Sequence, residues 1–288
     1  MQRPPDVDGK RLAALVRRAF GDADVSLERT PEGVSAQVYR VTKASQIFYL
    51  RVAEDAAQDL RVDAEVHHEL LRRGVRVPEV TCADAEWLVM TEVPGAPVTA
   101  DEPEVARAAG RDLARLNQVP APGFGWIREP LPSYADFVVS YLPAHLPPLW
   151  SAATRAAIEA EVAAERRVLR PRACLAHGDF DATQIFAHGG RYTGVIDLGE
   201  LRGTEPTFDL GHFYLQHGGD SPLWAPLVQG YAEVAGAAAA PLAAIRRSAL
   251  LLGLRQLCRW IDGPRRLPLD HAAVVARARR VEELLPAR

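Results

Sequence analysis

Lysine is nearly absent from this sequence. Of its 34 basic residues only Lys10 and Lys43 are lysines, and the others are arginines. The 37 acidic residues outnumber the basic ones, so the formal net charge is −3. A chain with this balance lacks the basic field that attracts a nucleic-acid backbone. We therefore expect no nucleic-acid partner.

Cysteine and long apolar runs are also scarce. The three cysteines, Cys82, Cys174 and Cys258, are far apart and odd in number, which argues against a disulfide framework or a metal-binding spacing. No apolar run approaches the roughly 20 residues of a membrane span. The first residues do not have the pattern of a signal peptide. We therefore expect a cytoplasmic protein with no membrane partner.

The rest of the composition is that of a globular protein. The chain has 288 residues, of which 48% are hydrophobic and 25% charged, enough for one large domain or two lobes. Strand and hairpin patterns dominate the first third, and helical periodicity dominates from Pro103 onward. Two prolines and a glycine at 94–97 follow a buried strand and indicate a crossover. We expect lobes at 1–93 and 94–288, with a hinge at about 91–97.

One stretch places acidic residues directly after short apolar runs. His177-Gly178-Asp179 follows one such run, and Asp197 follows the next. Between them, Gly189-Gly190 is typical of a hairpin turn. The pattern predicts two neighbouring strands whose ends hold Asp179 and Asp197 side by side. A base and a metal ligand in phosphoryl transfer need this arrangement.

These residues resemble the aminoglycoside phosphotransferase family, small-molecule kinases with a two-lobed, protein-kinase-like α+β fold. The shared pattern is His-Gly-Asp, an amide side chain five residues after the Asp, and then Ile-Asp-x-Gly. The resemblance implies that Asp179 is the base for the acceptor hydroxyl and that Gln184 and Asp197 hold Mg²⁺. It also implies that Asp209 supports the catalytic loop from behind. The family usually has Asn where Gln184 stands, and Gln is one methylene longer.

The same resemblance implies nucleotide-binding residues in the N-terminal lobe, with ATP or GTP as co-substrate. Ser35 would lie in the hairpin that covers the phosphates. Arg51 stands where kinases place a phosphate-binding lysine, and Glu65 on the next helix would pair with it. Taken alone, Glu65 fits a solvated helix carboxylate equally well. The backbone of Glu92 and Val93 would contact the edge of the purine base of the nucleotide.

The acceptor stays open at this stage. The resemblance favours an antibiotic, with an aminoglycoside first, and Asp181 and Glu200 would supply negative charge for such a polycation. From Pro241 onward, however, ten arginines face four carboxylates, which is the wrong sign for a polycation if these helices line the site. A hydroxylated metabolite or another antibiotic is the alternative. We expect a monomer or a weak dimer.

Two further classes of protein fit the same residues. A non-catalytic nucleotide-binding module would keep the pocket and lose turnover, and the replacements at Arg51 and Gln184 are compatible with that. A metal-dependent hydrolase would use His177 together with the carboxylates of the same stretch. The order of strands and helices fits a kinase better than a hydrolase.

Overall fold

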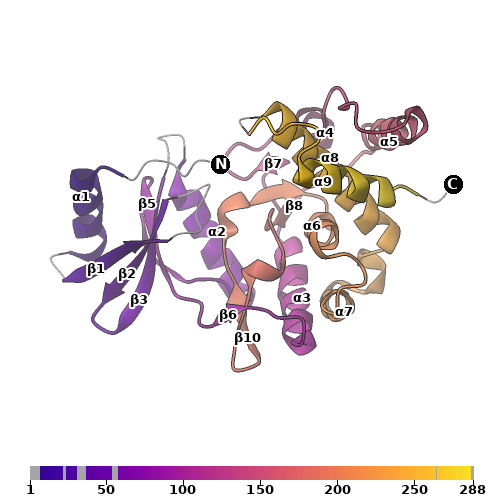
Figure 1. Cartoon of the computed structure of the whole chain (residues 1–288). Coiled ribbons are helices and arrows are strands. Elements are labelled where there is room, and N and C mark those ends of the chain that lie inside the picture. Colours follow the sequence, from indigo (N-terminus) through magenta and orange to yellow (C-terminus); the bar gives the residue numbers. More distant parts are fainter. Residues whose placement is uncertain (1–6, 22–23, 31–36, 54–57, 264, 287–288) are drawn as a thin grey trace.

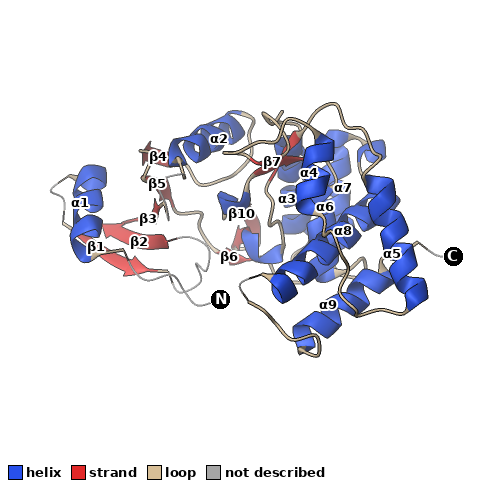
Figure 2. Ribbon diagram, turned by 90° about the horizontal axis from the view of Figure 1, so that it is seen from above, coloured by secondary structure: helices blue, strands red, loops and turns tan. Residues whose placement is uncertain are grey.

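Two lobes make up the computed structural model of the chain (Figure 1). The structure describes residues 7–21, 24–30, 37–53, 58–263 and 265–286. A five-stranded antiparallel sheet with two helices forms the N-terminal lobe, and the C-terminal lobe is mainly helical (Figure 2). The predicted two-lobed α+β fold is therefore confirmed. All three cysteines are free thiols, as expected.

The N-terminal sheet has the strand order β1-β2-β3-β5-β4. The strands are β1 (Val25–Arg29), β2 (Gln37–Lys43), β3 (Gln46–Val52), β4 (Val80–Ala83) and β5 (Trp87–Thr91). Alternate side chains such as Val41, Leu50 and Val89 form a buried face against helix α1 (Gly9–Phe20). Asp8 begins this helix by accepting the backbone N–H groups of its first turn. The sheet is thus built from the hairpins that the sequence predicts.

Helix α2 (Leu60–Arg72) lies where the two lobes meet (Figure 1). Its first buried apolar residues, Leu60 and Ala64, pack against the N-terminal sheet. Near its end Leu70 packs in a cluster with Leu116 and Leu198 of the C-terminal lobe. A polar residue on the buried side of α2 is therefore well placed to contact both lobes.

The C-terminal lobe packs long helices around one large core. The helices are α3 (Pro103–Asn117), α4 (Tyr134–Tyr141), α5 (Ala152–Glu165), α6 (Phe208–His217), α7 (Trp224–Ala235), α8 (Leu242–Asp262) and α9 (Ala272–Glu283). Helix α3 packs along α7, and α8 packs between α6 and α9. By length and composition alone, the segment Ala237–Asp262 could cross a membrane, but Leu250, Leu254 and Leu257 of this helix lie in the core.

Short strands position the polar residues of interest. They are β6 (Ala96–Pro97), β7 (Gly125–Trp126), β8 (Cys174–Ala176), β9 (Ile185–His188), β10 (Arg191–Val195) and β11 (Arg202–Thr204). The Gly189-Gly190 turn joins β9 to β10, whereas β8 pairs with β11 in a different sheet. The prediction that the two Asp-bearing strands are neighbours was therefore wrong. Strand β9 pairs with β10 instead, so paired strands do not hold the two aspartates side by side.

Candidate active site

One buried carboxylate holds the backbone of the loop that carries Asp179. Asp209, at the start of α6, is fully buried and accepts the N–H groups of His177 and Gly178, each at 2.9 Å. The side-chain amide of Asn117 donates to the same carboxylate at 2.9 Å. Hydrogen bonds to an ionised acceptor are stronger than neutral ones. The loop is thus fixed from behind in the way that the resemblance implies.

Two close contacts join this loop to the segment that follows β10. Nε2–H of His177 donates to the Ile196 carbonyl at 2.8 Å, and Nδ1 accepts the Asp179 N–H at 3.4 Å. Gly178 has φ of 90°, and a Cβ there would lie 1.9 Å from the Glu200 carbonyl oxygen, so only glycine fits. Because both ring nitrogens of His177 are engaged, this residue is not available to a metal ion. That finding argues against the metal-dependent hydrolase.

Asp179 is accessible and touches a buried histidine. Its side chain is 46% exposed, and Oδ1 lies 3.2 Å from Nε2 of His212, which is only 2% exposed. Nδ1–H of His212 donates to the Phe180 carbonyl at 3.0 Å. Since Nδ1 of His212 is engaged with this carbonyl, Nε2 is the ring atom that faces Asp179. Sequence reasoning missed His212, whose one signal is its position three residues after Asp209 on α6.

The side-chain oxygen atoms of Asp197 and Gln184 accept no hydrogen bond from the described residues. Asp197 is exposed and has φ of 60°, a conformation uncommon for a residue with a side chain. The backbone N–H of Ile196 donates to the backbone carbonyl of Gln184 at 3.0 Å, so Gln184 lies next to the residue that precedes Asp197. In the described part of the chain, no three His, Cys, Asp or Glu residues could hold a metal ion by themselves. One carboxylate and one amide oxygen fit Mg²⁺, which usually also takes phosphate oxygens and waters.

Arg51 on β3 has Asp63 as its carboxylate partner, and not Glu65. Nη1 of Arg51 lies 3.7 Å from Oδ1 of Asp63. Glu65 is exposed because it lies about 200° further round the helix than Asp63. The predicted pairing with Glu65 was therefore wrong. Arg128, in the loop after β7, shares Asp63 through hydrogen bonds of 2.9 and 2.6 Å, and sequence reasoning had singled out neither of these two residues.

Arg51 also lies beside Asp197. A Cβ on Gly199 would be 3.0 Å from Oδ1 of Asp197 and 3.5 Å from Nη2 of Arg51. Burial lowers the pKa of Arg51, and the neighbouring cation Arg128 lowers it as well. The carboxylates of Asp63 and, more weakly, Asp197 raise it. A cation from the N-terminal lobe and a carboxylate from the C-terminal lobe thus meet at one place.

The connection after β5 holds Glu92 and Val93, both half-buried. No described residue accepts a hydrogen bond from the Val93 N–H, which leaves it free for a ligand. The Val93 side chain lies against β10, because its Cγ1 would be 3.2 Å from a Cβ on Gly194. The contact of Glu92 and Val93 with the purine base of the nucleotide stays a prediction. Ser35, predicted for the phosphate loop, lies outside the described residues.

The two carboxylates predicted for the acceptor already have partners. Asp181 accepts the N–H and the hydroxyl of Thr183, at 2.7 and 2.6 Å. Glu200 pairs with Arg202 at 2.6 Å. Burial raises the pKa of Glu200, Arg202 opposes the shift, and the neighbouring Asp179 adds to it. Asp181 lies in the catalytic loop and Glu200 beside it, and their contact with an acceptor stays a prediction.

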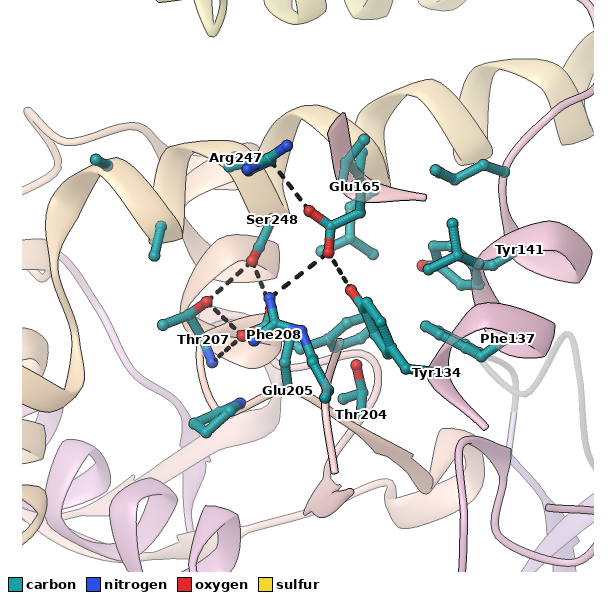
Figure 3. Close-up of a pocket in the computed structure, with 18 of the residues that line it drawn as sticks. Tyr134, Phe137, Tyr141, Glu165, Thr204, Glu205, Thr207, Phe208, Arg247 and Ser248 are labelled. Carbon is teal, nitrogen blue, oxygen red and sulfur yellow. Dashed lines mark hydrogen bonds and ion pairs between the residues drawn. The ribbon is translucent and has the colours of Figure 1, made fainter. Parts of the chain in front are cut away.

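A separate cavity of about 530 Å³ lies between α4, α5, α8 and the start of α6 (Figure 3). In it, the hydroxyls of Ser248 and Thr207 donate to Glu205, and the Tyr134 hydroxyl donates to Glu165. No residue of the catalytic loop 177–184 lines this cavity. We therefore place the candidate active site at Asp179 and not here.

Comparison with known proteins agrees with this geometry. The sequence model of the phosphotransferase enzyme family matches residues 26–251, and the chain belongs to that family. No curated protein sequence matches it. The match includes the catalytic loop, Asp197 and Arg51.

Solved structures of several small-molecule kinases share the fold. The aminoglycoside phosphotransferase APH(4)-Ia superposes with a TM-score of 0.70 at 16% identity, covering 97% of this chain and 100% of the other. The macrolide 2'-phosphotransferase MphH from Brachybacterium faecium has a TM-score of 0.63 at 18% identity, covering 97% and 98%. A putative fructosamine-3-kinase from Thermobifida fusca has a TM-score of 0.66 at 21% identity, covering 96% and 100%.

Proposed function

We propose that this chain is a small-molecule kinase that transfers the γ-phosphoryl group of ATP or GTP to a hydroxyl group. The observation that carries the proposal is one juxtaposition. An accessible carboxylate, Asp179, projects from a loop fixed by Asp209, and that loop contacts the segment in which Asp197 lies beside Arg51. Phosphoryl transfer depends on alignment and charge neutralisation more than on covalent help.

The C-terminal lobe supplies the groups for the chemistry. Asp179 orients the acceptor hydroxyl and takes its proton as the new oxygen–phosphorus bond forms. The bond between the γ-phosphorus and the bridging oxygen breaks, and the nucleoside diphosphate leaves. Asp197 and Gln184 would hold Mg²⁺, which neutralises phosphate charge when bound.

The N-terminal lobe supplies the groups for the nucleotide. Arg51 contacts the phosphates, and Asp63 holds its guanidinium in place. An arginine can bind phosphate through two parallel hydrogen bonds, so the usual lysine is not required for this role. Ser35 would cover the phosphates, and the backbone of Glu92 and Val93 would contact the base.

The nucleotide would lie between lobes formed by residues 1–93 and 94–288, with the hinge at about 91–97. We propose a cytoplasmic monomer or weak dimer, in keeping with the charge and composition of the chain. The partners are then a nucleoside triphosphate and a small acceptor molecule.

Aminoglycosides head the panel of acceptors to test. A thermostable mutant of APH(4)-Ia, 17% identical to this chain, forms a ternary complex with ADP and hygromycin B. Asp181, in the catalytic loop, and Glu200, beside it, are the carboxylates that amines would approach. A hydroxylated metabolite or a different antibiotic is the other candidate, because a macrolide phosphotransferase and a putative fructosamine kinase share the fold.

The test is Mg²⁺-dependent loss of the γ-phosphate from ATP or GTP in the presence of aminoglycosides, macrolides and hydroxylated metabolites. Turnover that one compound stimulates, with a phosphorylated product, supports the kinase. Binding of Mg²⁺-nucleotide with no turnover for any compound contradicts it. That outcome would leave a nucleotide-binding module.

A further inference from the structure

A hollow of about 430 Å³ lies where α6, α8 and α9 meet, within the size range of small-ligand sites. Its walls include His217, Trp260 and Arg277. His217 connects it to the catalytic loop, because its Nε2 accepts the Ala182 N–H at 3.2 Å. Ala182 is three residues from Asp179, so the loop that carries the candidate base touches a wall of the hollow.

Arg277 lines this hollow as a half-buried cation with a neutral partner. Its Nη2 donates to Oε1 of Gln216 at 2.8 Å, and its guanidinium carbon lies 5.5 Å from the centre of the Trp260 ring. Nη1 is buried and has no hydrogen-bond partner among the described residues. Burial lowers the pKa of Arg277, and the neighbouring cation Arg280 acts in the same direction. A cation in this position is unfavourable until an anion joins it.

Some sheltered arginines of this chain have a carboxylate partner. Arg202 pairs with Glu200 at 2.6 Å, and Arg247 pairs with Glu165 at 3.0 Å. Arg255 instead donates to the Tyr141 carbonyl and lies over the Tyr141 ring. For Arg277, no described carboxylate lies within ion-pair distance, so its charge is one that an anionic ligand would neutralise.

His217 provides a second donor for an anion. Because its Nε2 accepts from Ala182, the neutral ring carries its hydrogen on Nδ1, and no described residue accepts that hydrogen. Burial lowers the pKa of His217 and favours this neutral form, against the smaller effect of Asp181. Asp220 also lines the hollow, but it is exposed. Its carboxylate lies on the side of Arg280, because a Cβ on Gly218 would be close to both side chains.

We infer that the acceptor carries a carboxylate or phosphate group, which binds Arg277 and His217 in this hollow while the acceptor hydroxyl reaches Asp179. This rests on the proposed kinase function and specifies the charge of its acceptor. An aminoglycoside would bring only positive charge to Arg277. The inference therefore favours a hydroxylated anionic metabolite, in line with the excess of arginine after Pro241.

Calorimetric titration of the full chain, saturated with Mg²⁺ and a non-hydrolysable ATP analogue, tests the site. The probes are 6-phosphogluconate, gluconate, their neutral counterpart glucitol, and kanamycin. We expect one or both anionic probes to bind and glucitol and kanamycin to bind at least tenfold more weakly; the better of the two identifies phosphate or carboxylate. Arg277→Gln should weaken anion binding about tenfold or more, because a charge-assisted contact is lost. Arg277→Lys should keep part of it.

Arg279→Gln is the matched control, since Arg279 is an exposed arginine on the same helix. It should bind the anions as the wild type does, and nucleotide affinity should be unchanged in all variants. The inference is overturned if no anion binds, if only kanamycin binds, or if Arg277→Gln and Arg279→Gln behave alike.

Product analysis separates this inference from the proposed function. Phosphoryl transfer to neutral or cationic acceptors alone would keep the kinase and remove the anion site. Anion binding that depends on Arg277, with no transfer to any compound, would keep the site and remove the kinase. Transfer to an anionic acceptor, with a raised KM in Arg277→Gln and an unchanged nucleotide KM, supports both.

Discussion

Arg51 of the N-terminal sheet pairs with Asp63 of α2, their closest charged atoms being 3.7 Å apart. The same carboxylate binds Arg128 from the other lobe. Asp63→Asn leaves two sheltered guanidinium groups without this partner, and breaking a buried ion pair typically destabilises a protein by about 3–5 kcal/mol. We expect lower stability in urea and weaker Mg²⁺-ATP binding. Glu65→Gln, on the exposed side of the helix, should change neither.

A double-mutant cycle on Arg51 and Asp63 measures their coupling in nucleotide affinity. We expect a coupling free energy of about 1 kcal/mol or more. Simple additivity, or an effect of Glu65→Gln as large as that of Asp63→Asn, would contradict the assignment of Asp63.

The wrong choice of Glu65 as the partner of Arg51 shows which part of this contact the sequence could predict. The helical periodicity that marks Leu60, Ala64 and Leu70 as buried includes Asp63 on the same side and excludes Glu65. The sequence therefore contained the signal for the correct partner, and the choice of Glu65 rested on the resemblance alone. Helical periodicity identifies the buried side of α2 because the periodicity depends only on residues close together in the chain.

Contacts between distant segments could not be predicted in this way. The fold class and the role of Asp209 were implied by the family resemblance, the Gly189-Gly190 turn followed from turn chemistry, and the structure agrees with all three. The pairing of β8 with β11, and the approach of His212 to Asp179, depend on tertiary packing between segments. No spacing in the sequence encodes such contacts.

Asp209 is the second residue to test. Asp209→Asn replaces one acceptor oxygen by a donor and opposes the N–H groups of His177 and Gly178. Hydrogen bonds to a charged group contribute about 1.5–3 kcal/mol each, so we expect on the order of 3 kcal/mol lower stability and a large loss of kcat. Urea unfolding and steady-state kinetics measure both. Asp270→Asn, at an exposed site, should leave both unchanged, and a similarly mild effect of Asp209→Asn would contradict its supporting role.

His212 is expected to position Asp179. His212→Asn keeps one donor near the Phe180 carbonyl but removes the ring nitrogen beside Asp179. We expect kcat to fall about a hundredfold, the cost of a slightly misplaced reacting group, with the nucleotide KM unchanged. A normal kcat, or a nucleotide KM that rises as kcat falls, would contradict this role.

His67 on α2 makes the stability depend on pH. It is 2% exposed, Nδ1–H donates to the Pro78 carbonyl at 2.8 Å, and burial lowers its pKa to about 4. Between pH ~6.5 and ~4 the unfolded chain binds a proton that the folded chain does not, so stability falls as the pH falls, by about 3 kcal/mol in total from this group. His67→Asn keeps a donor and should remove this contribution from urea-unfolding curves across that range. An unchanged slope would contradict the assignment.

The most direct test of the central claim compares Asp179→Ala with Asp197→Ala. Phosphoryl transfer and Mg²⁺-nucleotide affinity are measured for both, with the wild type alongside. We expect each change to lower transfer at least about a hundredfold, while only Asp197→Ala strongly weakens Mg²⁺-nucleotide binding. Equal nucleotide affinity in the two variants, or near-normal transfer by Asp179→Ala, would contradict the roles of base and metal ligand.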